Sequence, residues 1–173
     1  MKKRFNKSGQ NVMGMSFGVI FSIILIIFII VVAGIVIKTF LKTGDCARIG
    51  MFLDENDKTS FKFAVEKAWK SPGIDFDYEA KLPSSLEYVC FANFSSGING
   101  RWEDIGEEIN VYEDENLFLY PIDNSCNQPA HKIEHLNIAE ITKTDNPYCI
   151  PVFNGKAVIN IDKEINEGLV RIK

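Results

Sequence analysis

VMGMSFGVIFSIILIIFIIVVAGIVI, residues Val12 to Ile37, decides how this chain is organised, because no charged residue interrupts it. As an α-helix it would be roughly 35 to 40 Å long, which exceeds the ~30 Å hydrocarbon core of a bilayer. A soluble helix of this length needs a polar face, and this stretch has none. The sequence therefore predicts a single helix that crosses a membrane and makes the lipid bilayer a partner of the chain.

The residues that flank this stretch predict its orientation. Four basic residues precede it, whereas Lys38 and Lys42 follow it, and the excess at the front favours a cytoplasmic N-terminus. A cleaved secretory signal has an apolar core of about 7 to 15 residues, which is much shorter than this one. We expect a retained anchor in a cell membrane, organised as a basic cytoplasmic leader (1–11), a transmembrane helix (12–37), a junction (38–45) and an extracytoplasmic domain (46–173).

The chain after the helix is strongly acidic. From Asp45 onward, all 23 acidic residues face 13 of the 19 basic residues, which gives a formal charge of −10. Such a domain repels nucleic acid and anionic lipid. The sequence therefore predicts no nucleic-acid partner, and no motif in it predicts a cofactor.

The four cysteines also lie beyond the helix, and none belongs to a CxxC pair. An even number of widely spaced cysteines fits two disulfides in an oxidising exterior, and the alternative is four buried thiols. Spacing allows three pairings. We expect Cys46 to pair with Cys90, which would tie the segment leaving the membrane to the sheet, and Cys126 with Cys149.

Small residues recur every four positions near the start of the apolar stretch, at Gly14, Gly18 and Ser22. At this spacing they share one helix face and allow two helix backbones to approach closely in lipid. The pattern predicts self-association or packing against a partner membrane helix.

The residues in front of the stretch carry a family resemblance. Basic residues followed by Ser8, Gly9 and Gln10 and then a long apolar helix resemble the class III signal of archaeal pilin-like proteins and the related signal of bacterial type IV pilins. The resemblance implies a cut between Gly9 and Gln10, after which the helix would bundle in a filament core. In bacterial type IV pilins, the fifth residue after the cut is usually Glu, whereas this chain has Gly14. The resemblance therefore favours filament assembly of the archaeal kind over the bacterial kind.

The domain is predicted to have an α+β fold, with one helix packed on a mostly antiparallel sheet. Apolar residues at helical spacing predict a helix from Phe61 to Trp69. The turn-forming residues Ser71 to Gly73 are expected to terminate it. Asn154-Gly155 predicts a tight hairpin turn. The expected strands are 76–78, 88–91, 109–112, 117–120, 149–153, 156–161 and 169–172.

Three further motifs are candidate sites. His131, Glu134 and His135 form H-x-x-E-H, which on a helix could bind zinc, and the alternative is two histidines on a loop. Two acidic clusters, Glu103 to Glu108 and Glu113 to Glu115, could bind Ca²⁺ or could be solvated turns. Asn93 begins an N-glycosylation sequon on a predicted turn.

Together these patterns favour a noncatalytic cell-surface protein that resembles a pilin-like subunit or minor pilin. The alternative is a permanently anchored, receptor-like or accessory subunit that binds a partner through its acidic domain. A membrane-tethered metallohydrolase is the third hypothesis.

Overall fold

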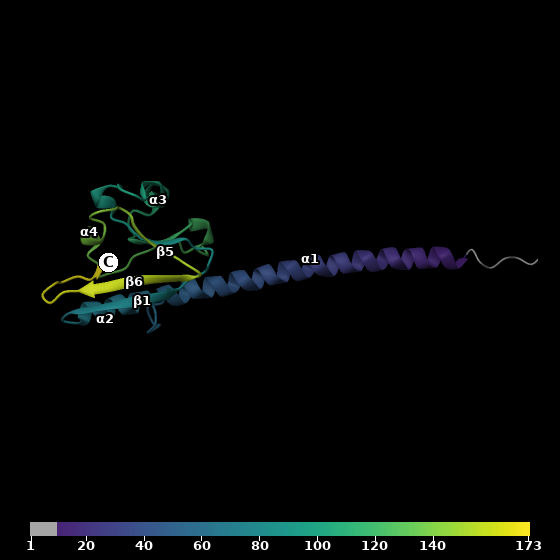
Figure 1. Cartoon of the computed structure of the whole chain (residues 1–173), viewed down its shortest axis with the longest axis horizontal. Helices are drawn as coiled ribbons and strands as arrows, with labels where there is room; N and C mark the ends of the chain where they lie inside the picture. Colours follow the sequence, from purple (N-terminus) through teal and green to yellow (C-terminus); the bar gives the residue numbers. More distant parts are fainter. Residues whose placement is uncertain (1–9) are drawn as a thin grey trace, which may run out of the picture. The chain divides into compact units, whose positions relative to one another are not determined.

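The computed structural model describes the backbone of residues 10–173 and the side chains of residues 18–173. The chain divides into two compact units, residues 1–43 and 44–173, and we describe each by itself. The model has an α+β fold, in which a long apolar helix is followed by a small domain of antiparallel sheets and short helices (Figure 1).

The apolar stretch lies in helix α1, Gln10–Leu53, which continues through the predicted junction 38–45 into the domain. Its composition changes from apolar on all sides to amphipathic at its C-terminal end. There Ile49, Phe52 and Leu53 are buried in the domain core. The domain therefore begins with the last turns of this helix.

After α1, the described chain contains seven strands and three further α-helices, joined by turns and loops. The helices are α2 (Phe61–Lys70), α3 (Glu103–Ile109) and α4 (Ile138–Ile141), and three short 3₁₀ turns are η2 (Phe94–Ser96), η3 (Asn110–Tyr112) and η4 (Ile122–Asn124). The strands are β1 (Ile74–Lys81), β2 (Tyr88–Phe91), β3 (Leu117–Tyr120), β4 (Ala130–His131), β5 (Tyr148–Pro151), β6 (Lys156–Lys163) and β7 (Arg171–Ile172).

The strands form two antiparallel sheets with the orders β1-β6-β7 and β4-β3-β2-β5. The two inner strands of the second sheet are buried on both faces. Val89 and Leu119 face the main core, whereas Cys90 and Phe118 face a second, smaller core beneath α3. This explains why β2 and β3 are continuous apolar runs and do not alternate with polar residues.

The predicted helix at 61–69 is confirmed as α2. Ser60 caps it by accepting a hydrogen bond from the backbone N–H of Phe63, and Phe61 stacks on Phe52 of α1 with ring centroids 5.4 Å apart. At the other end, the buried ammonium of Lys163 on β6 donates to the carbonyls of Trp69 and Ser71. These carbonyls have no intrahelical partner, so Lys163 fastens the end of α2 to the sheet.

The expected strand at residues 109–112 is wrong. Ile109 ends α3, and Asn110–Tyr112 form the turn η3. The β-branched composition of these residues suggested a strand, but Ile105 and Ile109 are four residues apart and share the buried face of a helix. Gly106 allows α3 to pack closely, because a Cβ at this position would overlap Ile98 and Pro147.

The predicted turn at Asn154-Gly155 is confirmed, with φ values of 51° and 74°. Phe153 and Lys156 pair across it. The flanking strands do not continue as a hairpin, however, because β5 belongs to the four-stranded sheet and β6 to the three-stranded sheet. The turn therefore connects the two sheets, which was not expected from the sequence.

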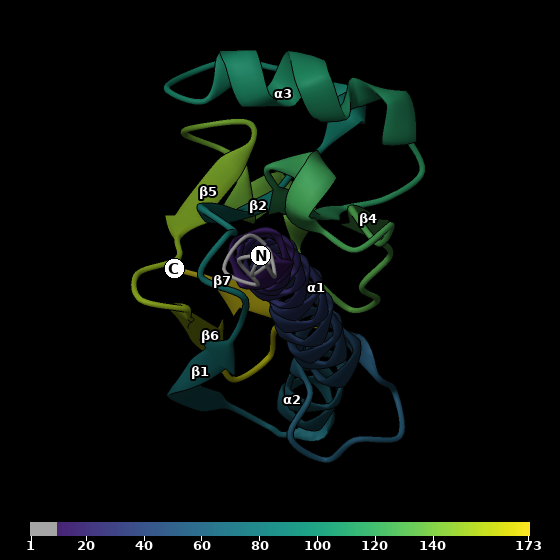
Figure 2. The same ribbon diagram turned by 90° about the vertical axis from the view of Figure 1, so that its right-hand side faces the viewer.

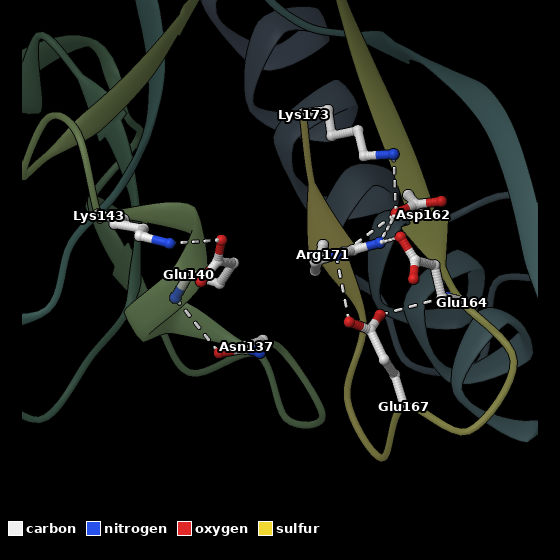
Figure 3. A network of polar contacts seen from close by, with 8 residues as sticks. All are labelled: Asn137, Glu140, Lys143, Asp162, Glu164, Glu167, Arg171 and Lys173. Carbon is white, nitrogen blue, oxygen red and sulfur yellow. Dashed lines mark hydrogen bonds and ion pairs between the residues drawn. The ribbon is translucent and has the colours of Figure 1, made fainter.

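A network of charges fixes the last strand (Figure 3). Arg171 pairs with Asp162 and Glu164, each at 2.6 Å, and with Glu167 at 3.2 Å. Lys173 pairs with the same Asp162 at 2.9 Å. Burial alone would raise the pKa of Asp162, but the hydrogen bonds and charges of Lys173 and Arg171 outweigh it and hold this pKa below its usual value.

Candidate functional site

The candidate functional region begins with the apolar part of α1. Its large apolar side chains between Val19 and Leu41 are all exposed in the isolated chain, from 41% for Val32 to 76% for Phe40. By length and composition, α1 is a helix able to cross a membrane. So continuous an apolar surface is far larger than soluble proteins expose, and it requires a covering of lipid or of other helices.

Hydroxyl groups in this part of α1 bond to the helix itself. Ser22 donates to the carbonyl of Gly18 at 2.9 Å, Thr39 to that of Ile35 at 3.0 Å, and Thr43 to that of Thr39 at 2.9 Å. Polar groups without partners are costly in hydrocarbon, and bonds to the carbonyl one turn earlier satisfy them. The helix is therefore compatible with lipid in spite of its polar residues.

The residues of the predicted packing face all belong to α1. A Cβ placed at Gly18 would meet no described atom within 4 Å, so this position offers open space to a neighbouring helix. The Ser22 hydroxyl keeps its bond to Gly18, and the face needs no polar partner. Packing through Gly14, Gly18 and Ser22 stays a prediction. Of the predicted cleavage pair, Gln10 is in α1 and Gly9 lies outside the described residues.

All four cysteines are paired, and the prediction of two disulfides is confirmed. The expected pairing is wrong: the bonds are Cys46–Cys126 and Cys90–Cys149. Cys90 and Cys149 are directly opposite residues of the antiparallel pair β2–β5, so strand register decides their bond. Cys46 lies in the last turns of α1 and is bonded across 80 residues to the segment after η4.

The helix required for zinc binding by H-x-x-E-H is absent from residues 130–135. His131 ends β4, Glu134 lies in a turn, and His135 has a φ of 66°. His135 stacks on Trp69 with ring centroids 3.6 Å apart, whereas His131 contacts the carbonyl of Gln128. Burial lowers the pKa of His131. The two histidines therefore have separate structural contacts.

The acidic clusters lie on and after α3. Glu103, Asp104, Glu107 and Glu108 are on its exposed side, and Glu113 to Glu115 follow η3. Within residues 18–173, no group of three or more His, Cys, Asp or Glu side chains is placed to hold a metal ion. Asn93 precedes η2, where its side chain accepts from the N–H of Ser95, and its glycosylation stays a prediction.

One hollow in the domain has a volume of about 450 Å³ and lies between α2 and the turn at 132–135. Opposite charges pair around it, as Lys62 does with Glu55 at 2.7 Å. Glu66 pairs with Lys70, whose hydrogen bond lowers the pKa of Glu66. These pairs leave little net charge to select a ligand.

A smaller hollow, which sequence reasoning missed, has a volume of about 260 Å³ and is lined by aromatic side chains. Tyr88 comes from β2, Trp102 precedes α3 and Tyr148 begins β5. These residues are far apart in the chain and meet because β2 pairs with β5.

No protein-family model, curated protein or solved structure matches the chain.

Proposed function

We propose that the chain is a noncatalytic cell-surface protein, anchored by the apolar part of α1, with residues 46–173 outside the cytoplasm. The observation that carries this proposal is the continuity of α1. One helix has an apolar surface all round and then becomes part of the core of a disulfide-bonded domain. A helix with this change in composition suits a chain that passes from lipid to water.

The orientation is supported by chemistry on both sides of the helix. Disulfides persist in oxidising exteriors, and both bonds lie in residues 46–173. The four basic residues before the apolar stretch favour the cytoplasm. The two disulfides and the N-terminal basic residues therefore predict the same orientation, with the N-terminus in the cytoplasm and the domain outside it.

We further propose that the protein is a pilin-like subunit or minor pilin, cut between Gly9 and Gln10. Such a cut would remove Lys2, Lys3, Arg4 and Lys7. These charged residues would otherwise have to cross the hydrocarbon core when the helix leaves the bilayer, which is costly. The remaining helix could then leave the bilayer and pack with like helices through its apolar surface. The role would be mechanical: the helices form a core and the acidic domains form the outer surface.

Intact-mass measurement of the protein purified from its native membrane tests the cut. We expect a mass that lacks residues 1–9, and we expect Gly9→Leu to retain them while Ser8→Ala is processed normally. Electron microscopy of shed material should then show filaments. A full-length mature chain would exclude the processed subunit and favour the permanently anchored accessory protein. A chain that is processed but never assembles would also favour the anchored protein.

A further inference from the structure

The aromatic hollow lined by Tyr88, Trp102 and Tyr148 has the features of a binding site. The rings of Tyr88 and Trp102 are tilted by 54° with centroids 4.7 Å apart, so they present faces at an angle to each other. Asp145 contributes a carboxylate to the same lining. Ring faces carry partial negative charge, and a carboxylate beside them adds a full one.

A cation already lies over one of these rings. The guanidinium carbon of Arg101 lies 4.6 Å from the centroid of the Trp102 ring, within the range of a cation–π interaction. The backbone N–H of Arg101 donates to Asp145 at 2.9 Å, which places the residue at the rim. Within the described residues, the Arg101 side chain forms no ion pair, so the ring face is its partner.

The frame around the hollow is firmly held. The amide of the fully buried Asn146 bonds to the backbone of Asn93 in both directions, and Asn146 pairs with Asn99 through backbone bonds of 2.7 and 2.9 Å. Cys149, which also lines the hollow, is bonded to Cys90. A site built on a rigid frame loses little conformational entropy when it binds a ligand.

The surroundings attract positive charge. Helix α3 starts directly after Trp102 and has four exposed carboxylates, none of which forms an ion pair with any described residue. The basic residues of α2 do not offset them, because α2 and α3 lie on opposite sides of the domain in both views (Figures 1 and 2). The residues from Asp45 onward, which include these four carboxylates, have a formal charge of −10.

We propose that this hollow binds an organic cation, either a quaternary ammonium group or the Lys or Arg side chain of a partner, over the faces of Tyr88, Trp102 and Tyr148. Asp145 supplies the counter-charge, and Arg101 acts as an internal occupant that the ligand displaces from Trp102. Burial raises the pKa of Tyr148, so its hydroxyl remains neutral and adds no charge of its own. The proposal goes beyond anchoring and assembly and does not depend on the cut after Gly9.

Binding can be measured on the full chain in maltoside micelles, labelled with ¹⁵N at the two tryptophan indoles. Trp69→Phe assigns the two signals. Tetramethylammonium and arginine amide serve as probes for the two sources of the cation, and tert-butanol is the neutral control of similar shape. We expect a saturable shift of the Trp102 signal with at least one cation and none with tert-butanol, while the Trp69 signal stays in place.

Two variants sharpen the test. Arg101→Ala should strengthen binding about two- to fivefold, because the cation–π contact of Arg101 with Trp102 no longer competes with the ligand. This factor corresponds to the free energy of an exposed cation–π contact. Asp145→Asn should weaken it severalfold. A stronger response to arginine amide than to tetramethylammonium supports a protein side chain as the ligand, and the reverse order supports a quaternary ammonium group. Equal shifts with tert-butanol, or no saturable shift in either the native chain or Arg101→Ala, would overturn the proposal.

Discussion

The two disulfides should differ greatly in their resistance to reduction. Cys90 and Cys149 are 0% and 7% exposed and lie beneath α3, whereas Cys46 and Cys126 are each partly exposed. A reductant can reach the Cys46–Cys126 bond in the folded domain. The other bond has little exposed surface, because Cys149 is 7% exposed where it borders the aromatic hollow and Cys90 is fully buried, so free access to it requires α3 and the edge of the sheet to open.

The difference in rate follows from the free energy of that opening. If opening requires most of the stability of a small domain, at least about 5 kcal/mol, the buried bond should be reduced about 10³-fold or more slowly. Reduction of the Cys46–Cys126 bond opens a loop whose ends are 80 residues apart. In the loop-closure model, this lowers the stability of the domain by about 4.5 kcal/mol. The Cys90–Cys149 bond should therefore become much easier to reduce once Cys46–Cys126 is gone. For this reason, the comparison between the two bonds uses initial rates.

The assay treats the folded chain with a phosphine reductant for increasing times and blocks free thiols with iodoacetamide. Peptide mass mapping then follows each bond separately. In denaturant, both bonds should be reduced at similar rates, which is the control for intrinsic reactivity. Equal initial rates in the native protein, or earlier loss of Cys90–Cys149, would refute the reasoning. A peptide that links Cys46 to Cys90 before reduction would refute the pairing itself.

Three further perturbations test other parts of the structure. Gly18→Leu should weaken self-association in vesicles, measured by energy transfer between labelled chains, while Gly34→Leu, about 160° around the helix, should not; equal effects would exclude the packing face. Lys163→Met should lower the free energy of unfolding by about 1 to 3 kcal/mol in a denaturant titration, since Trp69 and Ser71 lose their donor; an unchanged midpoint would contradict this role. The pKa of Asp162 is lowered in the folded state, so its contribution to stability is present above its unfolded pKa of about 3.9 and is lost as pH falls toward the folded value. Asp162→Asn should therefore reduce the acid dependence of stability below about pH 5, and an unchanged slope would show that the network does not act through this carboxyl.

Local patterns predicted the elements that local forces determine. The repeat of Phe61, Ala64, Val65 and Ala68 required one buried helix face, and α2 has it. The uninterrupted apolar stretch likewise predicted a helix irrespective of its partners. Helix α3 was missed because its seven residues contain too few apolar positions for a periodic signal, and its position depends on contacts with Ile98 and Pro147.

The features that depend on strand pairing could not be predicted from the sequence. Nothing local places Cys149 opposite Cys90, since 59 residues separate them and only the register of β2 with β5 brings them together. The same pairing assembles the aromatic hollow. For residues 131–135, zinc binding by H-x-x-E-H would have required a helix, but pairing of β4 with β3 and the left-handed backbone of His135 produce a strand and a turn.

The corrected pairing changes how the domain would bear load on α1. A force applied along this helix enters the domain through its last turns, where Ile49, Phe52 and Leu53 are buried in the core. The Cys46–Cys126 bond lies at the start of these turns, so it holds covalently the point where force arrives. The pairing expected at first would have joined Cys46 to the inner strand β2. The observed bond instead joins the last turns of α1 to the segment after η4, which is outside β2 and its pairing with β3 and β5.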